Sequence, residues 1–260
     1  MIFAASEIAP SPDWRLAVVL VALVALGVAA SRLGRLDVER ETVVASLRAI
    51  AQLAVISLVI AAVLGSLWWS ALFALVMLGV ATRTSAKRIQ ARGKEVLWVG
   101  GAILAGVLPV LVLVLGSGVI PFNGAGLVPT AGIIIGNTMT AATLTGRRAY
   151  DELSAQFGAY EAGLALGLES RDAASEVIQP TGKEALTPNL DKTRTVGLVQ
   201  LPGAFVGVLL GGGTPLEAGA AQVLVLVGIV AAQAVTSAVL LRMIADAHVV
   251  RDDMRERYPR

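Results

Sequence analysis

The sequence predicts an all-α, polytopic integral membrane protein with about seven transmembrane helices. Two observations lead to this fold class. Hydrophobic residues make up 56% of the 260 residues and charged residues only 15%, whereas soluble domains carry roughly 25% charged residues. The apolar residues also gather into stretches that approach or exceed the length of about 20 residues needed to span a bilayer as helix. A soluble core could not bury so much apolar surface.

Seven apolar segments are candidates to cross the membrane. The third is the shortest, and it follows the second after only three residues, which predicts a tight helical hairpin. Trp14, Trp68, Trp69 and Trp98 lie at segment ends, where an aromatic belt would place them. The predicted segments are residues 14–30, 43–64, 68–82, 96–116, 127–145, 196–212 and 218–241.

The basic residues alternate between the gaps that separate these segments. All of the 21 Lys and Arg residues except Arg15 lie in every second gap, at its edge, or after the last segment. Cytoplasmic loops carry an excess of Lys and Arg. The pattern therefore predicts an N-terminus outside the cell and a C-terminus in the cytoplasm.

The only long gap, residues 146–195, falls on the cytoplasmic side. We expect a single transmembrane domain over residues 1–260 with this segment as a cytoplasmic insert. Its pattern predicts helical pieces at 147–168, 170–178 and 183–186, separated near Pro180 and Pro188. Two membrane-length segments bracket the insert, which favours a docking surface for a cytoplasmic partner. An ordinary solvated loop is the alternative.

Several kinds of chemistry are disfavoured by residues that the sequence lacks. It has no GxxxxGK[ST] phosphate loop, so it does not bind ATP in that way. It has no cysteine, and its one histidine, His248, lies in the charged C-terminal tail. The apolar segments contain no pair of carboxylates, which disfavours both an intramembrane enzyme and a proton-coupled transporter. We therefore predict no catalytic residue and no resident metal site.

The apolar segments do contain polar side chains that are costly to bury in lipid unless they are satisfied. Such side chains form hydrogen bonds between helices or line a water-filled path. Asn137 and Thr138 are the best candidates for a path because they lie mid-segment, after the flexible Gly136. The full set of candidates for a substrate pathway is Gln52, Asn137, Thr138, Met139 and Gln200.

Small residues recur at a spacing of four in the fifth and sixth segments. GxxxG spacing allows helix backbones to approach closely, either within one chain or between two. Pro202 lacks an N–H group and is expected to kink the sixth segment. The predicted helix-packing residues are Gly132, Gly136, Pro202, Gly203, Gly207 and Gly211.

Four blocks of the sequence resemble the FetB-type permease family, the membrane subunits of a bacterial ABC system linked to iron export. Plant aluminium-sensitivity proteins are similar to the same family. The resemblance runs from about Arg48 to about Ala245. The blocks are RAIAQLAV, PTAGIIIGNTMTAATLTGRR, EAGLALG and ALTPNLDKTRTVGLVQLPGAFVGVLLGGGTPLEAGAAQV.

The resemblance implies a permease subunit of the cell membrane, surrounded by lipid, with no role for nucleic acid. It implies two permeases working with two copies of a separate cytoplasmic ATPase, which would use ATP and Mg. The EAGLALG block looks like the region that ABC permeases place against their ATPase. The residues implied in coupling are Glu161, Ala162, Gly163 and Gly167, followed by Asp191, Lys192 and Thr193.

The substrate is left open by both arguments. The resemblance suggests iron or another metal, but the segments lack the embedded carboxylate, histidine or cysteine that metals prefer. The site is then weak and transient, or the substrate is a metal complex, or it is a different compound. A gradient-driven transporter or channel, and a membrane scaffold that recruits a soluble protein, are the alternative functions.

Overall fold

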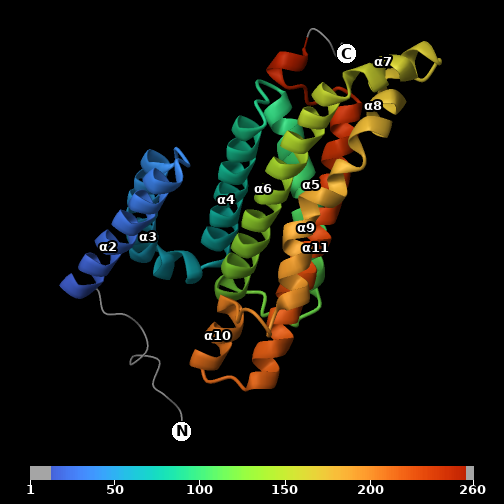
Figure 1. The fold of residues 1–260 in the computed structure, drawn as a ribbon. Helices are drawn as coiled ribbons and strands as arrows, with labels where there is room; N and C mark the ends of the chain where they lie inside the picture. Colours follow the sequence, from blue (N-terminus) through green and yellow to red (C-terminus); the bar gives the residue numbers. More distant parts are fainter. Residues whose placement is uncertain (1–12, 256–260) are drawn as a thin grey trace.

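The computed structural model describes residues 13–255, and nearly all of this part is helical (Figure 1). Six of its helices are long and apolar enough to cross a membrane, which confirms the all-α, polytopic fold class. They are α2 (Trp14–Gly34), α3 (Glu39–Leu64), α4 (Leu67–Arg88), α5 (Glu95–Gly116), α6 (Gly124–Ala155) and α11 (Pro215–Ala245). Four shorter helices lie between α6 and α11: α7 (Phe157–Ala165), α8 (Ser170–Ile178), α9 (Thr181–Thr195) and α10 (Gly203–Leu210). A 3-10 turn, η1 (Asp252–Met254), follows α11.

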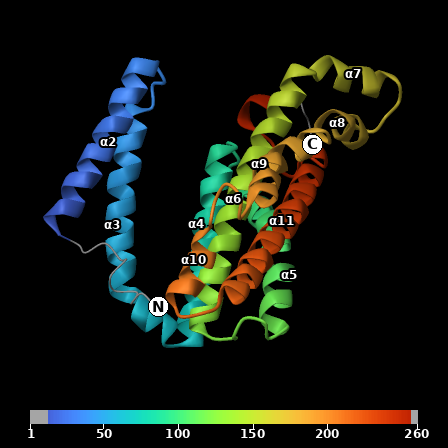
Figure 2. The same ribbon diagram turned by 60° about the horizontal axis from the view of Figure 1, so that its bottom comes forward.

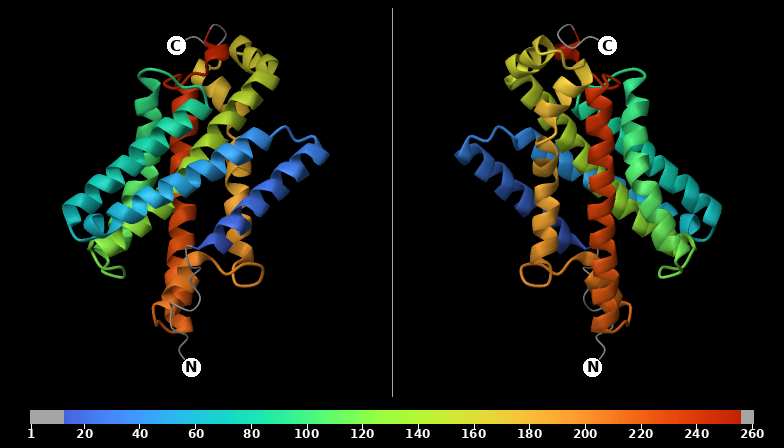
Figure 3. Two further views of the ribbon diagram at one scale, coloured as in Figure 1. Left: turned by 90° about the vertical axis from the view of Figure 1, so that its left-hand side faces the viewer. Right: turned by 90° about the vertical axis from the view of Figure 1, so that its right-hand side faces the viewer.

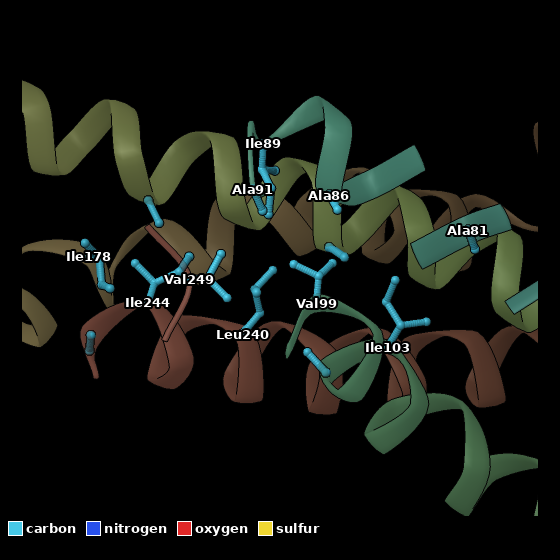
Figure 4. Close-up of a cluster of buried hydrophobic side chains, with 14 of the residues drawn as sticks. Ala81, Ala86, Ile89, Ala91, Val99, Ile103, Ile178, Leu240, Ile244 and Val249 are labelled. Atoms are coloured by element: carbon cyan, nitrogen blue, oxygen red, sulfur yellow. The ribbon is translucent and has the colours of Figure 1, made fainter. Parts of the chain in front are cut away.

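Helices α4, α5, α6 and α11 pack around one apolar core. Figure 4 shows Val99 of α5 beside Leu240 of α11, with Ile103 and Ile244 further out along these helices and Ile89, just after α4, above them. All five side chains are almost fully buried. The core therefore holds these four helices as one body, against which the shorter helices are placed.

The hairpin of α2 and α3 stands apart from this body (Figures 1 and 2). It joins the bundle through a tight turn at Gly65 and Ser66, as the short gap in the sequence predicted. Helix α3 has no buried residue, and α2 has only Ser31. Both helices are strongly apolar, so their exposed faces suit contact with lipid or with another protein chain.

Side-chain caps fix where two of the long helices begin. Asn123 accepts a hydrogen bond from the backbone N–H of Gly126 at 2.9 Å, which caps the start of α6. Thr214 and Glu217 form a reciprocal capping box at the start of α11. Such caps satisfy backbone donors that a helix leaves unpaired at its N-terminus. The N-terminal ends of α6 and α11 are thus defined by local sequence. After the orientation predicted from the sequence, this end of the bundle is called the outer end, and the opposite end, near α7 and α8, the cytoplasmic end.

The prediction of one membrane-length helix over residues 196–212 is wrong. Val196 and Gln200 form an isolated backbone bridge instead, and helix resumes only at Gly203. Gly197 has φ of +81°, and Pro202 lies immediately before α10 in an extended conformation. Glycine adopts this left-handed region easily and proline has no N–H to donate, so both interrupt a helix.

Between α8 and α11, the chain therefore returns from the cytoplasmic end of the bundle to the outer end in two parts. Helix α9 runs beside α6 and α11 (Figure 3), and the irregular stretch and α10 complete the descent. The helices thus still alternate in direction, although only six are long apolar helices among residues 13–255. The predicted orientation of the two termini relative to a membrane stays a prediction.

Two further expectations about the insert are wrong in detail. The piece predicted at 147–168 is divided at Gln156, where α6 ends and α7 begins. Pro188 does not separate helical pieces, because α9 continues through it from Thr181 to Thr195. A proline within a helix removes one hydrogen bond, and here the packing of α9 on α6 and α11 offsets that loss.

Candidate functional site

A pocket of about 460 Å³ with a mixed polar and apolar lining lies where α6, α9, α10 and α11 meet. At about 1.5 Å of rise per residue, Asn137 is about 20 Å along α6 from its outer end, and Gln222 is about 10 Å along α11. The hydrocarbon core of a bilayer is about 30 Å thick. The pocket is therefore at membrane depth. Its polar lining residues are Asn137, Asn189, Lys192, Thr193, Gln200 and Gln222.

The path of α9 explains how charged residues of the insert reach this depth. Near its start, Gly182 lies against Leu241, close to the cytoplasmic end of α11. The helix then descends along α6 and α11 (Figure 3), and its second half presents Asn189 and Lys192 to the pocket. Charged side chains at membrane depth are costly unless they face protein or water. This helix is therefore suited to line an aqueous path rather than to face lipid.

Asn137 is held in the pocket wall by backbone and side-chain hydrogen bonds. Its side-chain Nδ2 donates to the Ile133 carbonyl at 2.8 Å. Its backbone carbonyl accepts from Nε2 of Gln233, a buried side chain of α11, at 2.9 Å. This second bond joins α6 to α11 directly behind the pocket.

The tip of the molecule at its predicted cytoplasmic end is formed by α7 and α8, which pack on each other (Figure 1). The turn after α7 is closed by Gly167, with φ of +89°, and by a bond from the Leu168 N–H to the Gly163 carbonyl. This is the Schellman pattern of a helix C-terminus, which requires a left-handed residue. A Cβ on Gly163 would lie only 3.0 Å from Ala173 of α8, so its small size permits the close packing of the two helices.

The exposed surface of this tip combines three leucines with charged side chains, which on α8 include Arg171, Asp172 and Glu176. Leu164, Leu166 and Leu168 are exposed, Leu166 to 86%, and the neighbouring Glu161 is exposed as well. Tyr160 faces inward instead, where its hydroxyl lies 2.9 Å from the Ser170 hydroxyl. Exposed leucines beyond the end of a membrane bundle indicate a surface for a protein partner.

The comparison with known proteins gives the family. Residues 14–248 match the sequence model of the uncharacterised protein family UPF0014. The chain belongs to the UPF0014 family. No solved structure matches the chain.

Plant and bacterial proteins are among the relatives of this UPF0014 chain. The rice protein "UPF0014 membrane protein STAR2" is 36% identical over 224 residues, covering 85% of this chain and 78% of its own. The Arabidopsis thaliana "Protein ALUMINUM SENSITIVE 3" is 35% identical over 219 residues, covering 83% and 80%. The Escherichia coli "Probable iron export permease protein FetB" is 32% identical over 124 residues, 48% of each chain. These matches confirm the resemblance drawn from the sequence, and the chain is a multi-pass membrane protein.

Of the predicted pathway residues, this UPF0014 structure brings Asn137 and Gln200 together in the pocket. Gln52 lies elsewhere, exposed on α3. Thr138 is fully buried and donates to the Ile134 carbonyl of its own helix at 2.7 Å. Met139 is partly buried and packs against the apolar core. A transport role for any of these residues stays a prediction.

The predicted coupling residues divide into two groups. Glu161, Ala162, Gly163 and Gly167 belong to α7 and its terminal turn at the cytoplasmic tip. Lys192 and Thr193 line the pocket, and the neighbouring Asp191 pairs with Arg194 along α9 at 3.1 Å. The two groups therefore occupy different ends of the insert, and their coupling role stays a prediction.

The predicted helix-packing glycines make no close contact within the described chain. A Cβ added to Gly136, Gly203 or Gly207 would meet nothing within 4 Å, and one on Gly132 would meet Met77 at 3.6 Å. Gly211 ends α10, and Pro202 precedes it. Packing of these residues between two chains stays a prediction. Close approaches to the backbone of another helix occur at Gly106 and Gly124, and Gly146 lies against the Ile89 side chain.

Two pocket residues, Asn189 and Gln222, were missed by sequence reasoning. Asn189 was overlooked because Pro188 indicated a break in the cytoplasmic insert. Gln222 is the first amide of the last apolar segment, and its position among apolar residues was the available signal. Among the described residues, no group of three or more His, Cys, Asp or Glu side chains could hold a metal ion.

The C-terminal tail fastens the cytoplasmic end of the bundle. The buried Tyr150 of α6 donates its hydroxyl to the Val249 carbonyl. Arg251 binds Asp151 and Asp253, both at 2.7 Å. The hydrogen bond with Asp253 raises the pKa of Arg251, and the bond with Asp151 adds to this effect, so the guanidinium remains charged. The tail therefore holds α6 in place next to the α7–α8 tip.

Proposed function

We propose that this UPF0014 chain is the membrane-spanning, non-catalytic permease subunit of an ABC transporter, powered by a separate cytoplasmic ATPase. The observation that carries the proposal is the α7–α8 tip, which exposes Leu164, Leu166 and Leu168 at the end of a membrane bundle, in a chain without a phosphate loop. The relative named "Probable iron export permease protein FetB" supports the permease role. The name of this relative also supports export as the direction of transport, and iron or another metal as the substrate.

The bundle offers a route by which an ATPase could act on the pocket. Helix α8 of the tip leads directly into α9, which lines the pocket. Helix α9 contacts both α6 and α11, so a displacement of the tip would change the pocket walls. Coupling of this kind needs an element with two arrangements that the partner biases. The interrupted stretch between α9 and α10 contains Gly197, and glycine can change its backbone conformation at low cost.

We also propose that two copies of the permease assemble. The faces that carry Gly136, Gly203 and Gly207 have no near neighbour in the described chain. Arg48 is exposed on the apolar helix α3, and the described ion pairs do not include it. A second copy would cover these faces and remove the charge from lipid. The mass of the purified complex would then correspond to two permeases and two ATPases.

Co-purification tests the proposed function. The permease is expressed with an ATPase whose gene lies beside its own and encodes GxxxxGK[ST], and ATP hydrolysis by the complex is measured. Leu166→Gln at the tip should abolish binding of the ATPase. Leu216→Gln is the matched control, because Leu216 is 84% exposed, close to the 86% of Leu166, but lies at the outer end of α11. Solute flux in ATP-free liposomes that follows an ion gradient, with no ATPase bound, would contradict the proposal.

A further inference from the structure

The charge of the membrane-depth pocket is unusual for a site that would take a bare metal ion. Its lining contains one cation, Lys192, together with four side-chain amides, and no Asp or Glu. None of the described ion pairs includes Lys192. Hard metal cations are bound by carboxylates and softer ones by imidazole or thiolate. A lysine ammonium repels such cations and attracts anions.

A helix N-terminus also opens into the pocket. Pro202, Gly203 and Ala204 line it, and they are the N-cap and first two residues of α10. No side chain caps this end of the helix. The backbone N–H groups of the first turn have no partner within the helix, and the helix dipole adds partial positive charge there. Interrupted transmembrane helices in transporters direct such N-termini at anionic substrate groups.

An independent observation is that Gln222, on α11, has a side-chain oxygen without a hydrogen-bond partner. This side chain lines the pocket and is 95% buried, since its exposed fraction is 5%. Its Oε1 has no hydrogen-bond partner in the structure. A buried polar atom without a partner costs free energy, which a ligand in the pocket would recover. The unpaired Oε1 of Gln222 can accept a hydrogen bond from a ligand, for example from a hydroxyl group or from a water bound to a metal.

We infer that the pocket binds its substrate as an oxyanion-bearing, hydroxylated chelate of the metal, and not as the bare ion. Lys192 and the N-terminus of α10 receive the carboxylate or phosphate oxygens of the chelating ligand. Gln222 and the other amides bind its hydroxyl groups. The metal then keeps its own oxygen ligands from the chelator, so the protein needs none. The inference rests on the proposed function, because it assigns a substrate class to the pocket of that permease.

The test measures binding to the full-length purified permease by isothermal titration, with citrate, ferric citrate and Fe²⁺ as separate probes. Citrate and ferric citrate should bind, and Fe²⁺ alone should not. Lys192→Gln should weaken chelate binding about tenfold to a hundredfold, since a charge-assisted hydrogen bond is lost. Lys192→Arg should retain most of the binding. Lys183→Gln, on the same helix but outside the pocket lining, is the matched control.

A second pair of variants tests the helix terminus. Gly203→Pro removes one N–H at the first helical position, where proline is tolerated, whereas Gly203→Ala keeps it. A Cβ at Gly203 meets nothing within 4 Å, so both should fold. Weaker chelate binding in the proline variant alone supports the inference. It is overturned if Fe²⁺ binds equally to wild type and Lys192→Gln, or if no chelate binds. Co-purification of the ATPase, measured on the same variants, reports separately on the proposed function.

Discussion

The packing of α5 on α11 predicts that Gly106→Ala destabilises the bundle. A Cβ on Gly106 would lie 2.2 Å from the Ala232 carbonyl oxygen and 2.2 Å from the Thr236 hydroxyl. Real Cβ contacts essentially never fall below 3.0 Å, so the atoms in contact must move apart by at least about 0.8 Å (3.0 minus 2.2), through separation or distortion of the two helices. Overpacking of this kind costs about 1–3 kcal/mol. For a chain of this size, each kcal/mol lowers the unfolding midpoint by about 2–4 °C.

The matched control is Gly101→Ala on the same helix, where the nearest atom to the added Cβ is Met243 Cε at 4.0 Å. Thermal unfolding of the purified protein in detergent compares the two variants with wild type. The midpoint of Gly106→Ala should fall by about 2–12 °C, and that of Gly101→Ala should stay the same or rise. Equal midpoints for both variants would refute the packing of α5 on α11 described above.

Three further changes have defined outcomes. Gly167→Ala should cost about 1–2 kcal/mol because alanine is strained at positive φ, and it should speed amide exchange over residues 163–168, whereas Gly158→Ala should not. Tyr150→Phe should cost about 1–3 kcal/mol by leaving the Val249 carbonyl without its donor, and the C-terminal tail should become more sensitive to protease. Glu95→Gln removes the buried one of the two carboxylates that pair with Arg255, at 3.1 Å, and leaves Asp252. It should lower stability by about 1–2 kcal/mol, measured as a lower unfolding midpoint whose difference from wild type persists in high salt.

The long helices could be predicted from sequence because their signal is local. An apolar stretch of sufficient length between charged gaps has few alternatives to a membrane helix. The short gap at Gly65 and Ser66 likewise leaves room only for a tight turn. Even α4 could be predicted, although its apolar part is short, because basic residues follow that part in the sequence. The helix itself ends at Arg88.

The sixth segment could not be predicted in this way because its fate depends on tertiary packing. Its composition is apolar enough for a helix, but Gly197 and Pro202 interrupt it. Helix α9 is polar and contains Pro188, so by sequence it belongs to a cytoplasmic insert. Its place along α6 and α11 depends on contacts between residues far apart in the chain, such as Gly182 with Leu241.

The residues of the candidate site also divide into those with a local sequence signal and those placed by tertiary packing. Asn137 and Gln200 could be selected because amides are rare in apolar segments. Lys192 was selected for a different reason, its block's resemblance to a permease family, and the structure places it in the pocket with both amides. Residues of α9 could join this site only once the helix was known to reach membrane depth.

Cysteine cross-linking tests most directly whether α9 brings the insert to the middle of α6. The natural sequence contains no cysteine, so Asn137→Cys and Lys192→Cys can be introduced together without background. A short bis-maleimide should join this pair in membranes. It should not join Asn137→Cys to Lys183→Cys, which lies about 13 Å further up α9 at 1.5 Å per residue. Cross-linking of the 137–183 pair, with none of the 137–192 pair, would contradict the membrane-depth pocket.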